Sequence, residues 1–176
     1  AETGCTSILC RMYNEEIIHV HHQRSQDEVQ VSFGRGRSLP LFRGAPSKVM
    51  LASLPTRRLR QLFEKHRAHP DVEAIAGDWP SFKRYFAEIR SAGSYFSNQE
   101  IEPDMLGICA PFEVEDVGAL GVISVVFSLR RSVLMNIDAC GAIVRSHAQQ
   151  ISSALKEFVR ESESTTGSIK RNSNSN

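Results

Sequence analysis

The order of hydrophobic patterns along the chain limits the folds that it can adopt. Alternation with period 2, which is typical of half-buried strands, comes first at residues 6–12 and 17–21, with a polar Asn14-Glu15 turn between them. Helical spacing follows, apolar β-branched segments return after residue 107, and a helical stripe comes last. Strands joined by hairpins and helices gathered in blocks predict an α+β domain on an antiparallel sheet.

Turn and capping residues in the sequence mark where the expected strands and helices begin and end. Further strands are expected at 29–33, 94–97, 107–114 and 121–128, with Asp116-Val117-Gly118 as a hairpin turn. Helices are expected at 44–52, from Pro55-Thr56 onwards, and from Pro80-Ser81 to Gly93. The last helix is expected at 133–159, with its apolar face formed by Ile137, Cys140, Val144, His147, Ile151, Leu155 and Phe158.

The balance of charge argues against a domain that binds nucleic acid by itself. Lys plus Arg number 21 and Asp plus Glu 20, which gives a net charge of +1. Such domains usually carry a basic excess because they must neutralise phosphates. The nearest basic cluster is Arg57, Arg58 and Arg60, on a predicted helix, and a solvated helix face explains it.

Cysteine spacing and hydropathy predict a cytoplasmic protein without membrane contact. No apolar run approaches the ~18 to 20 residues of a membrane span, and residues 1–9 lack a signal-peptide pattern. Cysteines at 5, 10, 109 and 140 form neither a C-x-x-C pair nor a zinc-ligand spacing. We therefore expect reduced, buried thiols and neither a metal nor a cofactor.

The chain is expected to contain one domain over residues 1–160. Residues 161–176 are rich in serine and lack aromatic residues. Because this segment cannot bury enough apolar surface to order itself, we expect a disordered polar tail.

Two glycine-containing segments match phosphate loops only in part. Gly34-Arg35-Gly36 lacks the third glycine, and residues 44–48 do not fit G-x-x-x-x-G-K-[ST]. The helix start at 44–48 nevertheless presents N–H groups and the positive end of a dipole, which attract carboxylates. An ordinary capped helix explains the same pattern.

The sequence assigns no catalytic residue and no metal site. His19 and His21 would share a strand face, but without a third ligand they are expected to be surface residues, and His147 is expected to be packed. Cys109 has no evident base or positive neighbour, and Ser124 has no assignable histidine. We therefore expect that the chain is not an enzyme.

Residues 37–52, RSLPLFRGAPSKVMLA, resemble the effector-binding domain of IclR-type bacterial transcription regulators, which carries G-x-x-L-P-L-H-A-T-A-x-G-K-A-L-L-A there. The likeness continues at 90–95, similar to R-x-x-G-Y, and at Glu100. It resumes at 108–111, Gly118, 123–125 and 151–155, so it covers about residues 6–157. The order and spacing of these motifs are more specific than any one of them.

This resemblance implies a GAF-like fold, in which a curved antiparallel sheet is flanked by helices and has a ligand pocket on one face. In such regulators the domain follows an N-terminal winged helix-turn-helix, which is absent from this chain, so DNA would be bound only through that part. The resemblance also implies a homodimer or homotetramer. The ligand would be a small organic effector, with a carboxylic acid as one candidate.

Carried over residue by residue, the family's pocket falls on backbone donors at Ala45 and Pro46 and on Ser97, Glu100, Met105, Gly107 and Ser124. Pro46 has no N–H, so Ser47 and Lys48 would have to supply the remaining donors. Gly107 stands where a cysteine is common in the family. Cys109 would face the same side of the strand and could line the cavity instead.

Three functions remain open from the sequence. The first is a ligand sensor that controls the DNA binding of the missing domain by a ligand-shifted conformation or assembly. The second is a GAF-fold thiol enzyme acting through Cys109, such as a free methionine sulfoxide reductase, and the third is an oligomerisation module with an occluded pocket. The sensor hypothesis requires the helix start at 45–48 to open towards the strands at 107 and 124.

Overall fold

An antiparallel sheet organises the domain, as the sequence predicts; within the described residues it has six strands, of which the one at 38–39 was not expected. The computed structural model describes residues 4–24, 34–114 and 118–172, with side chains up to residue 160. The strands lie in the order β3-β2-β1-β6-β5-β4. Their bounds are β1 Thr6–Tyr13, β2 Glu16–Gln23, β3 Ser38–Leu39, β4 Tyr95–Asn98, β5 Met105–Val114 and β6 Gly118–Ser128.

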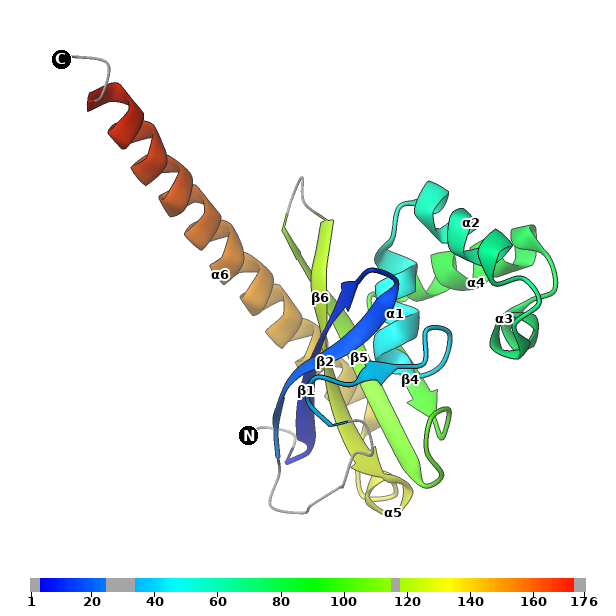
Figure 1. Cartoon of the computed structure of the whole chain (residues 1–176). Coiled ribbons are helices and arrows are strands. Elements are labelled where there is room, and N and C mark those ends of the chain that lie inside the picture. The colour runs from blue at the N-terminus through cyan, green and yellow to red at the C-terminus, as the bar shows by residue number, and fades with distance from the viewer. Residues whose placement is uncertain (1–3, 25–33, 115–117, 173–176) are drawn as a thin grey trace.

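Helices cover both faces of this sheet (Figure 1). A block of four helices lies on one side: α1 Ala45–Ser53, α2 Thr56–Lys65, α3 Pro70–Ile75 and α4 Trp79–Ala92. The short α5, Leu129–Ser132, follows β6, and the long α6, Ile137–Asn172, packs on the other side and extends away from the body. Each side has its own core, one between the sheet and the helix block and one between the sheet and α6.

The first hairpin is fixed by its turn and by an ion-pair cluster. Asn14 and Glu15 both have positive φ angles, 47° and 69°, as expected for the central residues of a type I′ turn. The Glu15 carboxylate lies 2.8 Å from Arg58 and 2.6 Å from Lys65 of α2. The hairpin tip is therefore joined to the helix block.

Helix α4 shows how the sequence sets its own limits. The Asp78 side chain accepts a hydrogen bond of 3.0 Å from the Ser81 N–H at its start, and this bond lowers the pKa of the Asp78 carboxyl. Gly93 ends the helix in the left-handed conformation, with φ 67°. Between them Phe82, Phe86 and Ile89 are buried on one face, as their spacing predicts.

The last helix differs from its prediction at its start. It begins at Ile137 rather than at 133, because the Asn136 side chain accepts a 3.0 Å hydrogen bond from the Ala139 N–H and caps the helix there. The short helix α5 precedes it, and Val133 between the two is 83% exposed.

The far end of α6 also departs from the sequence expectations. Phe158 is 69% exposed rather than packed. The C-terminal part of α6 runs past the sheet (Figure 1). The helix continues to Asn172, into the segment whose composition predicts disorder. Once a helix is nucleated, each added residue gains one backbone hydrogen bond, so a polar segment can prolong it.

Two further expectations lie partly or wholly outside the described residues. The strand expected at 29–33 and part of the turn at 116–118 fall there.

Helix α3 was not expected from the sequence. It starts at Pro70, and the His69 side chain accepts a hydrogen bond from the Asp71 N–H. None of the helices in the described residues combines the length and apolarity needed to cross a bilayer.

Two phenylalanines test the assignment of the core. Phe82 is fully buried, with ring centroids 4.9 Å from Phe63 and 4.8 Å from Phe86. We expect Phe82→Ala to lower the free energy of unfolding by about 3 to 5 kcal/mol, measured by urea denaturation. Phe158→Ala, the control, should change it by less than about 0.5 kcal/mol, because that ring is exposed. Equal effects of the two variants would contradict the packing described here.

Candidate functional site

A cavity lies between the start of α1 and the sheet, and it is called the α1 cavity below. It holds about 60 Å³ of open space. Ala45 and Pro46 bound it on the helix side, and Gly107 and Ser124 on the sheet side. Its walls are mostly apolar and include Ile8, Leu39, Ile101, Met105 and Val126, and its polar lining consists of His19, Ser97, Glu102 and Ser124.

Gly107 lies at a close contact in the wall of this cavity. It pairs with Ser97 across β4 and β5. A Cβ atom at position 107 would lie 3.3 Å from the Ser97 Oγ and 3.8 Å from the Ala45 Cβ. Glycine therefore lets Ser97 and the helix start approach β5 closely, and a larger side chain would extend between the helix start and the sheet, on the side where the sensor hypothesis places the ligand.

Six of the nine residues carried over from the family surround the α1 cavity: Ala45, Pro46, Ser97, Met105, Gly107 and Ser124. Their role in ligand binding stays a prediction. Ser47 is absent from the lining, and its hydroxyl donates a 2.6 Å hydrogen bond to the Pro40 carbonyl. Cys109 does face the same side as Gly107, but it is fully buried in the core between the sheet and the helix block, so the expectation that it lines the cavity is wrong.

Glu100 is the third of the carried-over residues that do not line the cavity. It binds the helix start instead. Its Oε2 accepts a 2.9 Å hydrogen bond from the Gly44 N–H, directly before α1. The same oxygen lies 2.7 Å from the Lys48 Nζ. The helix start thus attracts a carboxylate, as its dipole predicts, and that carboxylate belongs to the chain itself.

The N–H groups at the helix start are partly used. The Lys48 N–H, one of the donors expected to face a ligand, donates to the Gly44 carbonyl at 3.1 Å. Pro46 has none to offer. The backbone therefore offers a ligand fewer donors than the family pattern implies.

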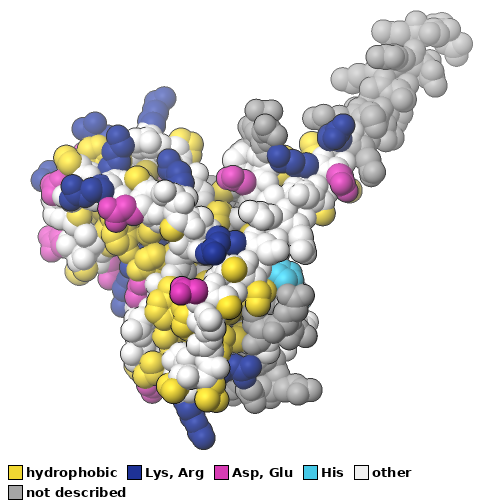
Figure 2. Space-filling model, turned by 180° about the vertical axis from the view of Figure 1, so that it is seen from behind, with side chains coloured by type: hydrophobic (Ala, Val, Ile, Leu, Met, Phe, Trp, Pro, Cys, Tyr) yellow, Lys and Arg dark blue, Asp and Glu magenta, His cyan; other side chains and the backbone are white. Residues whose placement is uncertain are grey.

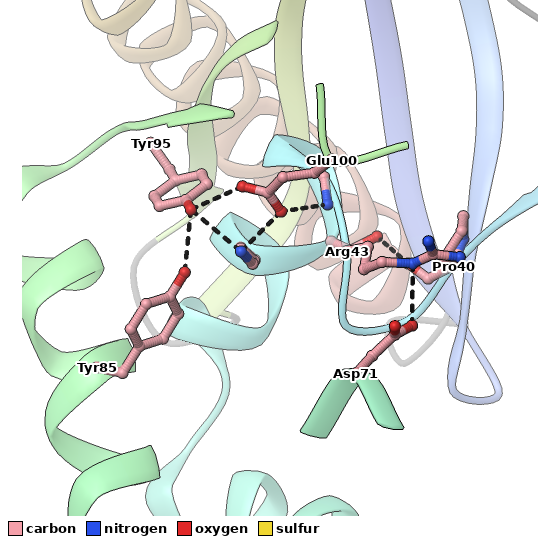
Figure 3. Close-up of polar contacts among 9 residues, drawn as sticks. Pro40, Arg43, Asp71, Tyr85, Tyr95 and Glu100 are labelled. Carbon is pink, nitrogen blue, oxygen red and sulfur yellow. Dashed lines mark hydrogen bonds and ion pairs between the residues drawn. The ribbon is translucent and has the colours of Figure 1, made fainter. Parts of the chain in front are cut away.

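Two tyrosines extend the contact at Glu100 (Figure 3). The Tyr95 hydroxyl donates to the Glu100 Oε1 at 2.8 Å and accepts from Tyr85 at 3.0 Å and from Lys48 at 3.1 Å. Burial, together with the bonds to Tyr85 and Glu100, raises the pKa of the Tyr95 phenol well above its usual value. Tyr95 therefore stays protonated and keeps donating to the carboxylate. Lys48, Tyr85, Tyr95 and Glu100 are called the Glu100 cluster.

The Glu100 cluster holds a loop over the cavity. Residues 99–104 connect β4 to β5, with positive φ at Gln99 and Asp104. Ile101 and Glu102 of this loop line the α1 cavity. Ile101 packs against Gly44 so closely that a side chain at position 44 would collide with it. The loop is therefore fixed to the helix start both by charge and by packing.

A β-bulge changes the orientation of one histidine. The register of β1 and β2 shifts between Leu9 and Cys10, which pair with His21 and His19. His19 lies on the same face as the buried Ile17 and lines the cavity, whereas the bulge leaves His21 exposed. The expectation that both histidines lie on the surface is therefore wrong for His19. Among the described residues, no group of three or more His, Cys, Asp or Glu side chains could hold a metal ion.

The cysteines are unsuited to thiolate chemistry. All four are buried and reduced. Burial raises the pKa of Cys10 to about 12, and burial followed by the neighbouring Cys10 raises the pKa of Cys109 well above its usual value. Because the thiolate is the reactive form, this environment disfavours a thiol enzyme acting through Cys109.

Comparison with known proteins identifies the family. The family model described as "Bacterial transcriptional regulator IclR C-terminal" matches residues 1–153. The chain belongs to the IclR family. Its relatives are domains of transcription regulators, and the GAF-like α+β fold expected from the resemblance is confirmed. No curated protein sequence matches the chain.

Solved IclR-type domains share this architecture. A C-terminal domain described as that of a transcriptional regulator from Vibrio cholerae has 28% identity and a TM-score of 0.70, over 84% of this chain and 85% of that one. IclR from Thermotoga maritima has 19% identity and a TM-score of 0.76, over 88% of this chain and 63% of that one. The inducer-binding domain of PobR from Acinetobacter, solved as a double mutant with 3-hydroxybenzoic acid, has 18% identity and a TM-score of 0.68, over 86% of this chain and 89% of that one.

Thiol reactivity gives one test of the site. We expect a thiol-specific disulfide reagent at about pH 8 to modify essentially none of the four cysteines in the folded protein, since all four are buried. All four should react in denaturant. Rapid modification of Cys109 in the folded state would contradict the buried position given to it.

A double-mutant cycle tests the Glu100 cluster. Lys48 and Glu100 have side chains only 10% and 18% exposed, so breaking the pair leaves a nearly buried charge. We expect Lys48→Met to lower the free energy of unfolding by about 2 to 4 kcal/mol, and the double variant with Glu100→Gln to lose clearly less than the sum of the single losses. The control is Lys65→Met, which breaks a contact with Glu15 whose lysine is 61% exposed and should cost about 1 kcal/mol or less. Additive losses at Lys48 and Glu100 would show that the two do not interact.

Proposed function

We propose that this domain senses a small organic effector in the α1 cavity and passes the signal to the rest of an IclR-type regulator. The observation that carries the proposal is the cavity itself, which lies between the helix start and Gly107 and brings together six of the family's pocket positions. In this proposal a DNA-binding part precedes the domain in a longer cytoplasmic protein. The near-neutral charge of this chain agrees with such a division of roles.

The surface supports the same division. On the face shown in Figure 2, basic side chains are interspersed with acidic ones over the helix block. Arg60, for example, lies 3.7 Å from Glu64 on α2, and Arg58 contacts Glu15. Basic side chains paired in this way attract phosphates weakly. We therefore propose that this domain acts on DNA only through the DNA-binding part that precedes it.

The elements around the cavity explain how a ligand could act. A ligand shifts an equilibrium only if it binds one state better than another. The α1 cavity is closed by two separate elements, the start of α1 and loop 99–104, and the Glu100 cluster joins them. A molecule that fits only when the loop is displaced would favour the displaced state. A coupling of about 1 to 3 kcal/mol would change the affinity for DNA roughly 5- to 150-fold.

The family's dimers or tetramers are part of this proposal. Ligand binding could favour one assembly of the domain over another. The remaining alternative is that the domain only oligomerises and binds no ligand. The open space of about 60 Å³ favours the sensor, because several water molecules or a small ligand fit into it.

The test is a screen of small organic molecules by thermal unfolding and calorimetry, with one variant that fills the cavity. Gly107→Leu should abolish the binding of any effector found, because the new side chain occupies the space between Ser97 and Ala45. The control is Gly77→Leu, where a side chain meets nothing within 4 Å. Undiminished binding to a folded Gly107→Leu variant would disprove the cavity as the effector site.

A further inference from the structure

We infer that the α1 cavity selects a small uncharged molecule and discriminates against carboxylates. This inference rests on the proposed function, since it names the chemical class of the effector. It departs from the carboxylic acid considered from the sequence. Three properties of the cavity carry it: the use of the helix start, the absence of Lys and Arg from its described lining, and the hydrogen-bonding groups that remain.

The position that an acid would take at the helix start is already partly occupied. A carboxylate at a helix N-terminus is bound by the free backbone N–H groups there. In this chain the Gly44 N–H donates to Glu100, the Lys48 N–H donates to the Gly44 carbonyl, and Pro46 has no N–H. A second carboxylate would also have to approach the charge of Glu100, which like-charge repulsion opposes.

The described lining contains neither Lys nor Arg to compensate a negative ligand. Its basic member is His19, and its acidic member is Glu102. Lys48 is the nearby ammonium, but it lies 2.7 Å from Glu100 and is outside the lining. Moving a carboxylate into a mostly apolar cavity without a paired charge is strongly unfavourable.

The groups that remain suit a neutral polar group. Ser97 is 7% exposed and lines the cavity, and among the described residues its hydroxyl has no hydrogen-bond partner. The Ser124 hydroxyl donates to the Ile108 carbonyl at 3.0 Å, so towards the cavity it can only accept. A carbonyl, amide or hydroxyl attached to a short apolar group matches this set.

The volume limits the size of such a molecule. About 60 Å³ is less than the roughly 150 Å³ of a cavity that accommodates benzene. A branched molecule with as many non-hydrogen atoms as benzene therefore fits only if loop 99–104 is displaced, which is the movement that the proposed function requires.

Isobutyramide and isobutyrate test the inference, because they share shape and size and differ in charge. We expect isobutyramide to shift the backbone amide resonances of Ser97 and Gly107 in a saturable NMR titration of the full chain. Isobutyrate should bind at least about tenfold more weakly. Ser97→Ala should weaken isobutyramide binding about three- to tenfold. Ser153→Ala, on the exposed face of α6, is the control and should have no effect.

A second variant should change the selectivity in a predictable direction. Pro46→Ala restores an N–H at the helix start beside the cavity. A hydrogen bond to a charged acceptor is stronger than one to a neutral acceptor, so isobutyrate should gain about tenfold or more and isobutyramide less. The control is Pro70→Ala, at the start of α3 and outside the lining of the cavity, which should leave both affinities unchanged.

The outcomes separate this inference from the proposed function. If isobutyrate binds wild-type protein as tightly as isobutyramide or more tightly, the inference is overturned, while the cavity remains an effector site. If neither probe shifts Ser97 or Gly107, the inference is overturned as well, and the sensor proposal is judged by the Gly107→Leu screen. Preference for isobutyramide that Ser97→Ala reduces supports the inference.

Discussion

The contact between Glu100 and the start of α1 joins the parts on which the site depends. One carboxylate binds the Gly44 N–H and the Lys48 ammonium, and so fixes the helix block to the loop between β4 and β5. Burial strengthens the contact, since Lys48 and Glu100 are largely shielded from water. Gly44 adds a steric condition, because its missing side chain admits Ile101. The cavity lies where these two elements meet the sheet at Gly107.

Much of the fold could be predicted from sequence because burial on a sheet or helix has a regular period. The faces of α2 and α4, the hairpin at Asn14-Glu15 and the end of α4 at Gly93 all follow from spacing and turn chemistry. The same rules failed where the regular period is broken. The bulge opposite Leu9 and Cys10 removed His21 from the face of His19, and the cap at Asn136 moved the start of α6.

The cavity could be predicted only in part, for a related reason. The strand and helix-start positions came from the family motifs, and period 2 would have added Ile8 and Val126, which face the same side. Ile101 and Glu102 lie in a loop without a periodic pattern, so no sequence signal places them over the cavity. Nor could spacing show that Glu100 would bind the helix start, since its partners are 52 and 56 residues away along the chain.

The central claim is that the effector binds between the helix start and Gly107. The most direct measurement is a crystal structure of the domain with a bound effector. The account predicts ligand density in contact with Ser97 and Ala45, on the α1 side of β5. An effector found on the α6 side of the sheet, or on the outer surface of the helix block with the α1 cavity unchanged, would contradict it.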